Sequence, residues 1–298
     1  MKKTWLILAA SLVLIGCILF AGIMSTVGWD FTKLSTVSYE TNTYEISEAF
    51  DSIVMNTNTT DIELIFSEEN NCNVVCHEEE QARHSVSVEN GTLVIEWMDN
   101  RPLYDWIGLN FSSPKITVSL PKAAYTTLLI HGDTSDIQIP DAFMFQDVDI
   151  SLTTGDVDIS ASASEKMKMK TSTGDICAQN LSVGSLDLTV STGDTYLTDI
   201  VCKSVISSGN TGDISLKNVI ATEIFSIERS TGDVTFDRCD AAALLIKTDT
   251  GDVSGTLLSE KVFLTETDTG SIHVPASMTG GRCEITTNTG DIRIRRPS

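Results

Sequence analysis

Hydrophobic and polar residues alternate along most of this chain, and the alternation restarts at a fixed interval. Each restart carries a Thr-Gly pair, and the intervals are 19 or 20 residues: Gly155, Gly174, Gly193, Gly212, Gly232, Gly251, Gly270 and Gly290. The residue two places after the glycine is apolar in seven of the eight copies, beginning with Val157 and Ile176. Alternation with a period of two is typical of a strand with one buried face.

A second apolar column lies twelve residues after the glycine, at Met167, Leu186, Val205, Ile224, Leu244 and Phe263. Each repeat is therefore expected to hold two short strands separated by turns, and a fixed period near 20 residues indicates a repeat architecture. Equivalent strands of successive repeats then pair, and crossovers between parallel strands are nearly always right-handed. We predict an all-β fold, a right-handed parallel β-solenoid (β-helix), over residues 45–298. Thr134-Ser135-Asp136 and Thr59-Thr60-Asp61 resemble earlier rungs.

The triplet Thr-Gly-Asp has a structural explanation at every position. Glycine adopts strained turn conformations without a Cβ penalty, threonine suits strands, and aspartate binds nearby turn amides. Asp follows seven of the eight glycines, and Ser271 replaces it once. Stacked carboxylates also offer oxygen ligands to a cation such as calcium. The alternative to a purely structural column is a weak metal site, with candidates at Asp175, Asp194, Asp213, Asp233 and Asp252.

One long segment, residues 66–112, interrupts the repeat. It contains a predicted hairpin around Asn90-Gly91, the favoured two-residue turn between alternating strands. An aromatic loop follows, and its partner-binding candidates are Leu103, Tyr104, Trp106 and Phe111. Loops carry binding more often than the frameworks beneath them, so we expect an exposed patch that meets a partner protein or membrane surface. The alternative is a buried cap over the first rungs.

The N-terminus carries a membrane signal. Lys2 and Lys3 precede an uncharged run from Thr4 to Trp29, which is long enough to cross a bilayer. The positive-inside rule predicts a single-pass cell-membrane protein with a cytoplasmic N-terminus, an anchor at 1–29, a linker at 30–44 and an extracellular C-terminal domain. A cleaved signal peptide and a lipoprotein signal at Cys17 are the alternatives.

Charge and cysteine content exclude other classes. The chain has 41 Asp plus Glu against 20 Lys plus Arg, a formal charge of −21, so nucleic-acid binding is not expected. The seven cysteines show no metal-binding spacing, and the four histidines show no motif, so we predict no cofactor. Some β-helix proteins cleave polysaccharides with clustered carboxylates, and this enzyme class (lyase or hydrolase) is the alternative function.

The anchor, the repeat Thr171–Ile176 and the first segment together resemble the bacterial β-strand-repeat proteins known as "putative adhesins". The resemblance covers residues 45–296 and implies a single-stranded right-handed β-helix, without any defined ligand or catalytic residue. It implies a membrane-anchored module with a binding, scaffolding or adhesin-like role at the bacterial cell envelope. The expected partner is an envelope protein or glycan.

Overall fold

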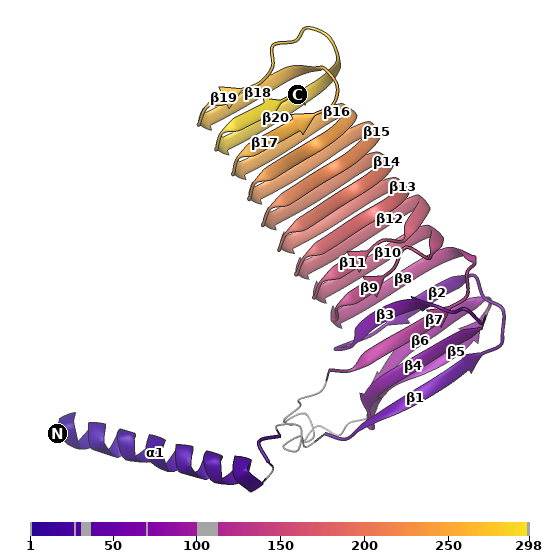
Figure 1. The fold of residues 1–298 in the computed structure, drawn as a ribbon, viewed down its shortest axis with the longest axis vertical. Helices are drawn as coiled ribbons and strands as arrows, with labels where there is room; N and C mark the ends of the chain where they lie inside the picture. Colours follow the sequence, from indigo (N-terminus) through magenta and orange to yellow (C-terminus); the bar gives the residue numbers. More distant parts are fainter. Residues whose placement is uncertain (1, 27, 31–36, 70, 100–112, 297–298) are drawn as a thin grey trace.

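The computed structural model describes residues 2–26, 28–30, 37–69, 71–99 and 113–296. The chain begins with helix α1 (Lys2–Thr26), and all the other elements are β-strands (Figure 1). Within α1, Trp5–Thr26 has a mean hydropathy of 2.8, which makes it long and apolar enough to span a membrane. A signal sequence near the N-terminus has the same properties, so the helix is either a signal sequence or an anchor.

The first strands form a region of mixed strand directions, here called the N-terminal region. Its strands are β1 (Tyr39–Ile46), β2 (Ser52–Asn56), β3 (Asp61–Phe66), β4 (Cys72–Glu79), β5 (Ala82–Glu89), β6 (Thr92–Asp99) and β7 (Lys115–Leu120). On one face, β4 lies antiparallel between β1 and β7, and β7 runs parallel to β3. On the other face, β5 pairs antiparallel with β6, which runs parallel to β2.

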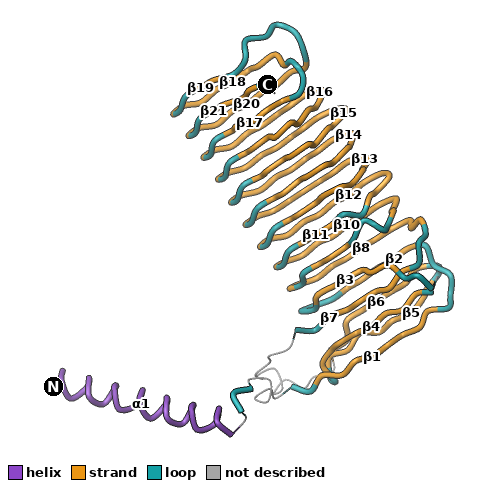
Figure 2. The backbone as a smooth tube through the Cα atoms, in the orientation of Figure 1, coloured by secondary structure: helices purple, strands orange, loops and turns teal. Residues whose placement is uncertain are grey.

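The parallel rungs follow from β8 onward, and Figure 2 shows them stacked as successive turns of one coil. The strands up to the last regular rung are β8 (Ala124–Thr134), β9 (Ile137–Ile139), β10 (Met144–Thr154), β11 (Val157–Ile159), β12 (Ser162–Thr173), β13 (Ile176–Thr192), β14 (Thr195–Thr211), β15 (Ile214–Thr231) and β16 (Val234–Thr250). The last strands are β17 (Val253–Leu257), β18 (Lys261–Thr269), β19 (Ile272–His273), β20 (Gly281–Thr289) and β21 (Ile292–Arg295). The predicted parallel β-solenoid is thereby confirmed.

Two earlier rungs proposed from the sequence are also present. β8 and β9 pair in parallel with β10 and β11, and β2 and β3 pair in parallel with β8 and β9. The hairpin prediction is confirmed as well, because Glu89 lies opposite Thr92 and leaves Asn90-Gly91 as the two-residue turn. The predicted linker at 30–44 needs a correction, since β1 begins at Tyr39 and pairs with β4 along its full length.

The core is one continuous column of apolar side chains between the two faces of the coil. Equivalent residues stack directly, as Ile176, Thr195, Ile214, Val234 and Val253 do along one face. All seven cysteines lie among the described residues; none is in a disulfide, and Cys72, Cys76, Cys202, Cys239 and Cys283 are buried. Cys72, Cys202, Cys239 and Cys283 fill the core as small apolar residues, the role expected from the sequence.

One core position differs from the sequence pattern. Phe225, rather than Ile224, pairs with Val205 and Leu244 and is fully buried. This repeat is 20 residues long instead of 19, and the additional residue is absorbed by a register shift between Cys202 and Ser204 of the neighbouring strand. A bulge flips the side-chain alternation, so counting from the glycine misplaces the inward residue by one.

The repeated glycine is required by two independent constraints. Gly212 has a φ of 128°, a region that residues with a Cβ rarely adopt. In addition, a Cβ at this position would overlap the carbonyl oxygen of Gly193 in the rung below. The amide of Gly212 donates to the carbonyl of Thr231 at 3.0 Å, so the turns themselves are tied from rung to rung.

The final two rungs are out of sequence order. β20 lies between β16 and β18, and β21 lies between β17 and β19. The last strands of the chain therefore insert beneath the rung that precedes them, and β18 with β19 form the end of the stack (Figure 1). The repeat predicts that every strand pairs with its equivalent one repeat later, and at this end of the coil that prediction is wrong.

Candidate functional site

The aspartates of the turns form a hydrogen-bonded ladder along one edge of the coil. Each carboxylate accepts the backbone N–H of the aspartate in the next rung, for example Asp194 N–H to Asp175 Oδ1 at 2.7 Å and Asp213 N–H to Asp194 Oδ1 at 2.8 Å. The full ladder is Asp61, Asp136, Asp156, Asp175, Asp194, Asp213, Asp233, Asp252 and Asp291. This arrangement explains the repeated aspartate as turn structure.

Ser271 occupies the end of this ladder. Its amide and its hydroxyl both donate to Asp291 Oδ1, at 2.6 and 2.8 Å. These two bonds lower the pKa of the Asp291 carboxyl, the backbone bond contributing most. Since β19 belongs to the last rung of the stack, no further turn among the described residues offers an N–H to the side chain at position 271. A carboxylate is not needed there, which accounts for the one departure from the triplet.

The acidic ladder brings carboxylates close but not into a cluster. Within the described ranges, the group whose ligand atoms all lie within 4.8 Å of one another is Cys76, Glu78 and His84, and it contains no ladder aspartate. Rungs about 4.8 Å apart place three successive carboxylates along a line rather than around a point. Cation binding by Asp175, Asp194, Asp213, Asp233 and Asp252 stays a prediction.

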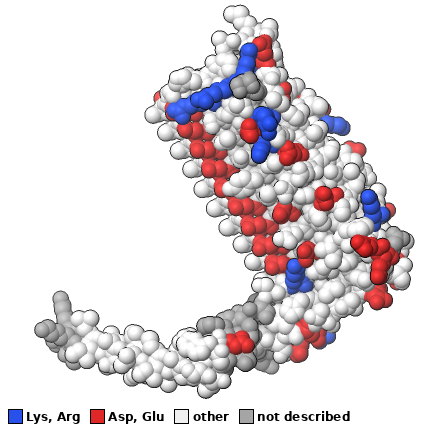
Figure 3. Space-filling view, viewed as in Figure 1, with Lys and Arg blue, Asp and Glu red and all other residues white. Residues whose placement is uncertain are grey.

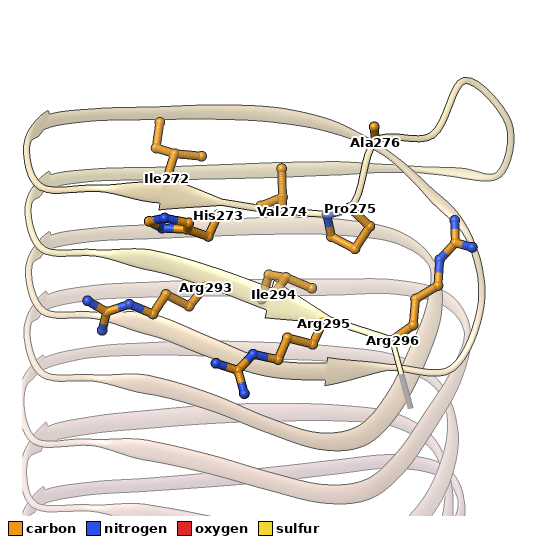
Figure 4. A pocket seen from close by; sticks show the side chains of 9 residues that line it. All are labelled: Ile272, His273, Val274, Pro275, Ala276, Arg293, Ile294, Arg295 and Arg296. Carbon is orange, nitrogen blue, oxygen red and sulfur yellow. The ribbon is translucent and has the colours of Figure 1, made fainter. Parts of the chain in front are cut away.

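The C-terminal end of the coil carries the opposite charge. Four of the eight arginines lie between residues 282 and 296. Figure 3 shows the acidic column along one edge and Lys and Arg side chains gathered at this end. A pocket of about 970 Å³ lies there, between β19 with its following loop and β21. Its lining residues are Ile272, His273, Val274, Pro275, Ala276, Arg293, Ile294, Arg295 and Arg296 (Figure 4).

The strands position this pocket through their alternation. On β21, Ile292 and Ile294 are buried, so Arg293 and Arg295 point outward on the same side (Figure 4). On β19, Ile272 occupies the column of Ile292 but is 41% exposed, because no rung covers it. The pocket thus combines an apolar floor at the open end of the core with a basic rim.

The three arginines that line the pocket differ in whether a carboxylate of the protein already pairs with them. Arg293 pairs with Asp291 and lies 3.9 Å from Asp252, and Arg296 pairs with Glu260 at 2.9 Å. Arg295 forms no ion pair with any residue in the described part of the chain. Guanidinium groups bind carboxylates and phosphates through paired hydrogen bonds, so this rim suits an anionic group.

This pocket was not predicted from the sequence. The sequence does contain a signal for the pocket, because this acidic chain places half of its arginines in its last 17 residues. The residues that were predicted to bind a partner, Leu103, Tyr104, Trp106 and Phe111, all lie outside the described residues. Cys76, Glu78 and His84 were also not expected to meet, because they come together across the core from two strands.

Comparison with known proteins identifies the family. A profile of the family "Toastrack DUF4097" matches residues 50–209 and 197–298. The chain belongs to this family. Two overlapping matches are what a repeat protein produces when its rungs fit the profile in two registers. No curated protein matches the chain.

The fold is shared with a solved structure. A "putative adhesin" from Bacteroides fragilis is 16% identical, covers 87% of this chain and 97% of its own, and gives a TM-score of 0.51. A "putative lipid binding protein" from Parabacteroides distasonis is 13% identical, with coverages of 88% and 98% and a TM-score of 0.48. A "putative adhesin" from the same species is 10% identical, with coverages of 84% and 98% and a TM-score of 0.48. The first of these similarities supports the fold alone.

Proposed function

We propose that this Toastrack protein is a membrane-anchored extracellular β-solenoid that binds or scaffolds at the bacterial cell envelope and does not catalyse a reaction. In this proposal α1 stays uncleaved, Lys2 and Lys3 remain in the cytoplasm, and the coil is right-handed. The length and hydropathy of Trp5–Thr26 support the anchor. Protease added to wall-stripped intact cells should then remove everything after Asp30, and full protection of that region would contradict export.

The partner-binding surface of this proposal is the basic pocket at the C-terminal end. One observation supports this proposal. The aspartate ladder ends at Asp291, and outward-facing arginines lie beside it at the open end of the core. Anions are repelled by a chain of net charge −21, so a local basic rim with an apolar floor is the surface that can select them. The proposed ligand is an anionic group on an envelope glycan or protein.

The test compares two arginines of the same rung, which lies directly beneath the end of the stack. Full-length protein in detergent is titrated with a carboxylated polysaccharide such as hyaluronate, with neutral dextran as the negative control. Arg295→Gln should weaken hyaluronate binding about 10- to 100-fold, because one guanidinium–carboxylate pair is worth roughly 1.5–3 kcal/mol. Arg282→Gln removes the same charge from β20, the other strand of this rung, but Arg282 does not line the pocket, so the substitution should change binding little. Equal weakening by both variants would contradict a defined pocket.

A polysaccharide-active enzyme is the other class to consider. It needs two carboxylates facing a substrate cleft. Glu78 is 1% exposed and hydrogen-bonded to His84 and Asn42, so it does not face one. The loop with Trp106 remains a second predicted binding surface. If it binds a partner, Trp106→Ala will abolish capture while leaving the melting temperature unchanged, whereas a cap would lose stability.

A further inference from the structure

The N-terminal region buries three metal-binding side chains together. Cys76 and Glu78 point inward from β4, and His84 points inward from β5 on the opposite face of the core. All three are 2% exposed or less. One ligand atom from each, a thiol sulfur, a carboxylate oxygen and an imidazole nitrogen, lies within 4.8 Å of the other two.

Hydrogen bonding explains part of this cluster. Glu78 Oε2 accepts the backbone N–H of His84 at 2.7 Å and lies 2.8 Å from its Nδ1, and Glu78 Oε1 accepts the Asn42 amide at 2.8 Å. These bonds satisfy the carboxylate. They leave His84 Nε2 buried and without a hydrogen-bond partner among the described residues. Because an ionised carboxylate only accepts, Nδ1 donates to Glu78 Oε2, and Nε2 is left as a buried nitrogen acceptor without a partner in the described part of the chain, which is costly.

The donor set is that of zinc. Sulfur, nitrogen and carboxylate oxygen bind Zn²⁺ at about 2.3, 2.0–2.1 and 2.0–2.2 Å, whereas calcium and magnesium prefer oxygen alone. Ligand atoms around one tetrahedral Zn²⁺ lie about 3.3–3.8 Å apart, so small side-chain shifts from the present spacing suffice. A thiolate and a carboxylate also cancel the two charges of the ion inside the core.

We propose that Cys76 Sγ, Glu78 Oε2 and His84 Nδ1 form a Zn²⁺ site. Binding displaces the thiol proton of Cys76, which leaves to solvent, and the imidazole proton moves from Nδ1 to Nε2 so that Nδ1 can bind the ion. His84 also lines a small pocket of about 160 Å³ beside Thr60 and Trp97, where a water molecule can accept a hydrogen bond from Nε2–H. Asn42 acts as a positioning residue, because it holds the second oxygen of Glu78. Three protein ligands leave a fourth position for water.

Metal titration of the full-length protein in detergent tests the site. The protein is stripped with chelator, and Zn²⁺ is titrated against a competing dye. We expect one tightly bound ion per chain. Co²⁺ in place of Zn²⁺ should give a thiolate-to-cobalt charge-transfer band, which needs no variant. Absence of that band, or binding with no defined stoichiometry, would overturn the proposal.

Variants assign the ligands. Loss of even an outer partner of a metal ligand costs 10–100-fold in affinity, so Asn42→Ala should weaken Zn²⁺ binding within that range. Cys76→Ser and His84→Gln should weaken it by about 100-fold or more and abolish the cobalt band. Cys72→Ser is the matched control, since Cys72 is equally buried on the same strand but outside the cluster. Equal loss in Cys72→Ser and Cys76→Ser would contradict the assignment.

Discussion

The rungs from β8 to β16 and the N-terminal region bury their apolar residues in the same core but are built differently. In the rungs, every turn from Gly155 onward repeats the same glycine and the same carboxylate-to-amide bond, and the strands pair in parallel. In the N-terminal region, strands run in both directions, and side chains such as Glu78 and His84 form contacts that occur once. Repetition leaves each rung residue with a structural role, whereas individual chemistry arises where the repeat is interrupted or ends.

The largest expected effect is on the free energy of unfolding. It distinguishes Gly212 in the rungs from Gly91 in the hairpin, although both have a positive φ. Gly212→Ala should lower the free energy of unfolding by roughly 3–5 kcal/mol, because backbone strain adds to a clash with the rung below. Gly91 in the hairpin has a φ of 79° but open space around it, so Gly91→Ala should cost only about 1 kcal/mol of stability. Urea unfolding of both variants measures the difference. Similar losses of stability in the two variants would mean that the close approach of the neighbouring rung adds nothing to the requirement for glycine at position 212.

The buried carboxylate of the N-terminal region should give a pH-dependent effect. Burial by itself would raise the pKa of Glu78, but the hydrogen bonds from His84 and Asn42 outweigh it and lower the pKa below its ordinary value. Glu78 therefore contributes stability that is fully present above about pH 4.3 and is lost as the pH falls through the lowered pKa. In chelator, Glu78→Gln should cost about 1.5–3 kcal/mol at pH 7.

The same variant should cost progressively less as the pH falls below 4, because the carboxyl of the wild-type protein then becomes protonated as well. Unfolding curves of the wild type and Glu78→Gln between pH 3 and pH 7 measure this. A stability difference that stays constant over the series would show that the charge of Glu78 is not what the hydrogen bonds stabilise.

A smaller effect is expected in the ladder of the rungs. Asp213→Ala removes the acceptor of the Asp233 N–H at an exposed turn, where water replaces part of the bond. The expected loss is about 1 kcal/mol. Asp237→Ala is the control, since Asp237 is similarly exposed but does not belong to the ladder. Its loss of stability should be near zero. If both variants behave alike, the ladder bonds do not stabilise the fold.

The smallest effect concerns cations. One oxygen of each ladder carboxylate already accepts an amide, so we expect the melting temperature to be nearly the same in calcium and in chelator for the Asp213→Asn variant and the wild type. Measurements are made with excess Zn²⁺ removed, which separates the ladder from the buried cluster. A large rise in melting temperature with calcium, lost in Asp213→Asn, would instead establish a cation site on the ladder.

The regular part of this fold was predictable because its signals are local and repeated. The glycine period, the alternation after Val157 and Ile176, and the Asn90-Gly91 turn each specify a backbone conformation within a few residues. One rung shows the limit of counting: the additional residue before Ile224 shifts the inward position to Phe225, since bulges are placed by packing rather than by period.

What only the tertiary structure decided lies at the two ends of the coil. All repeats offer nearly the same backbone hydrogen-bonding edge to the next rung. The sequence therefore does not indicate that β20 and β21 insert beneath β18 and β19, or that Ser271 ends the ladder as a result. That insertion also creates the pocket around Arg295. Likewise, Cys76 and His84 are brought together across the core by the β4–β5 turn. The sequence determines the rung because a rung is made of local conformations, whereas the sites depend on which edges and faces meet.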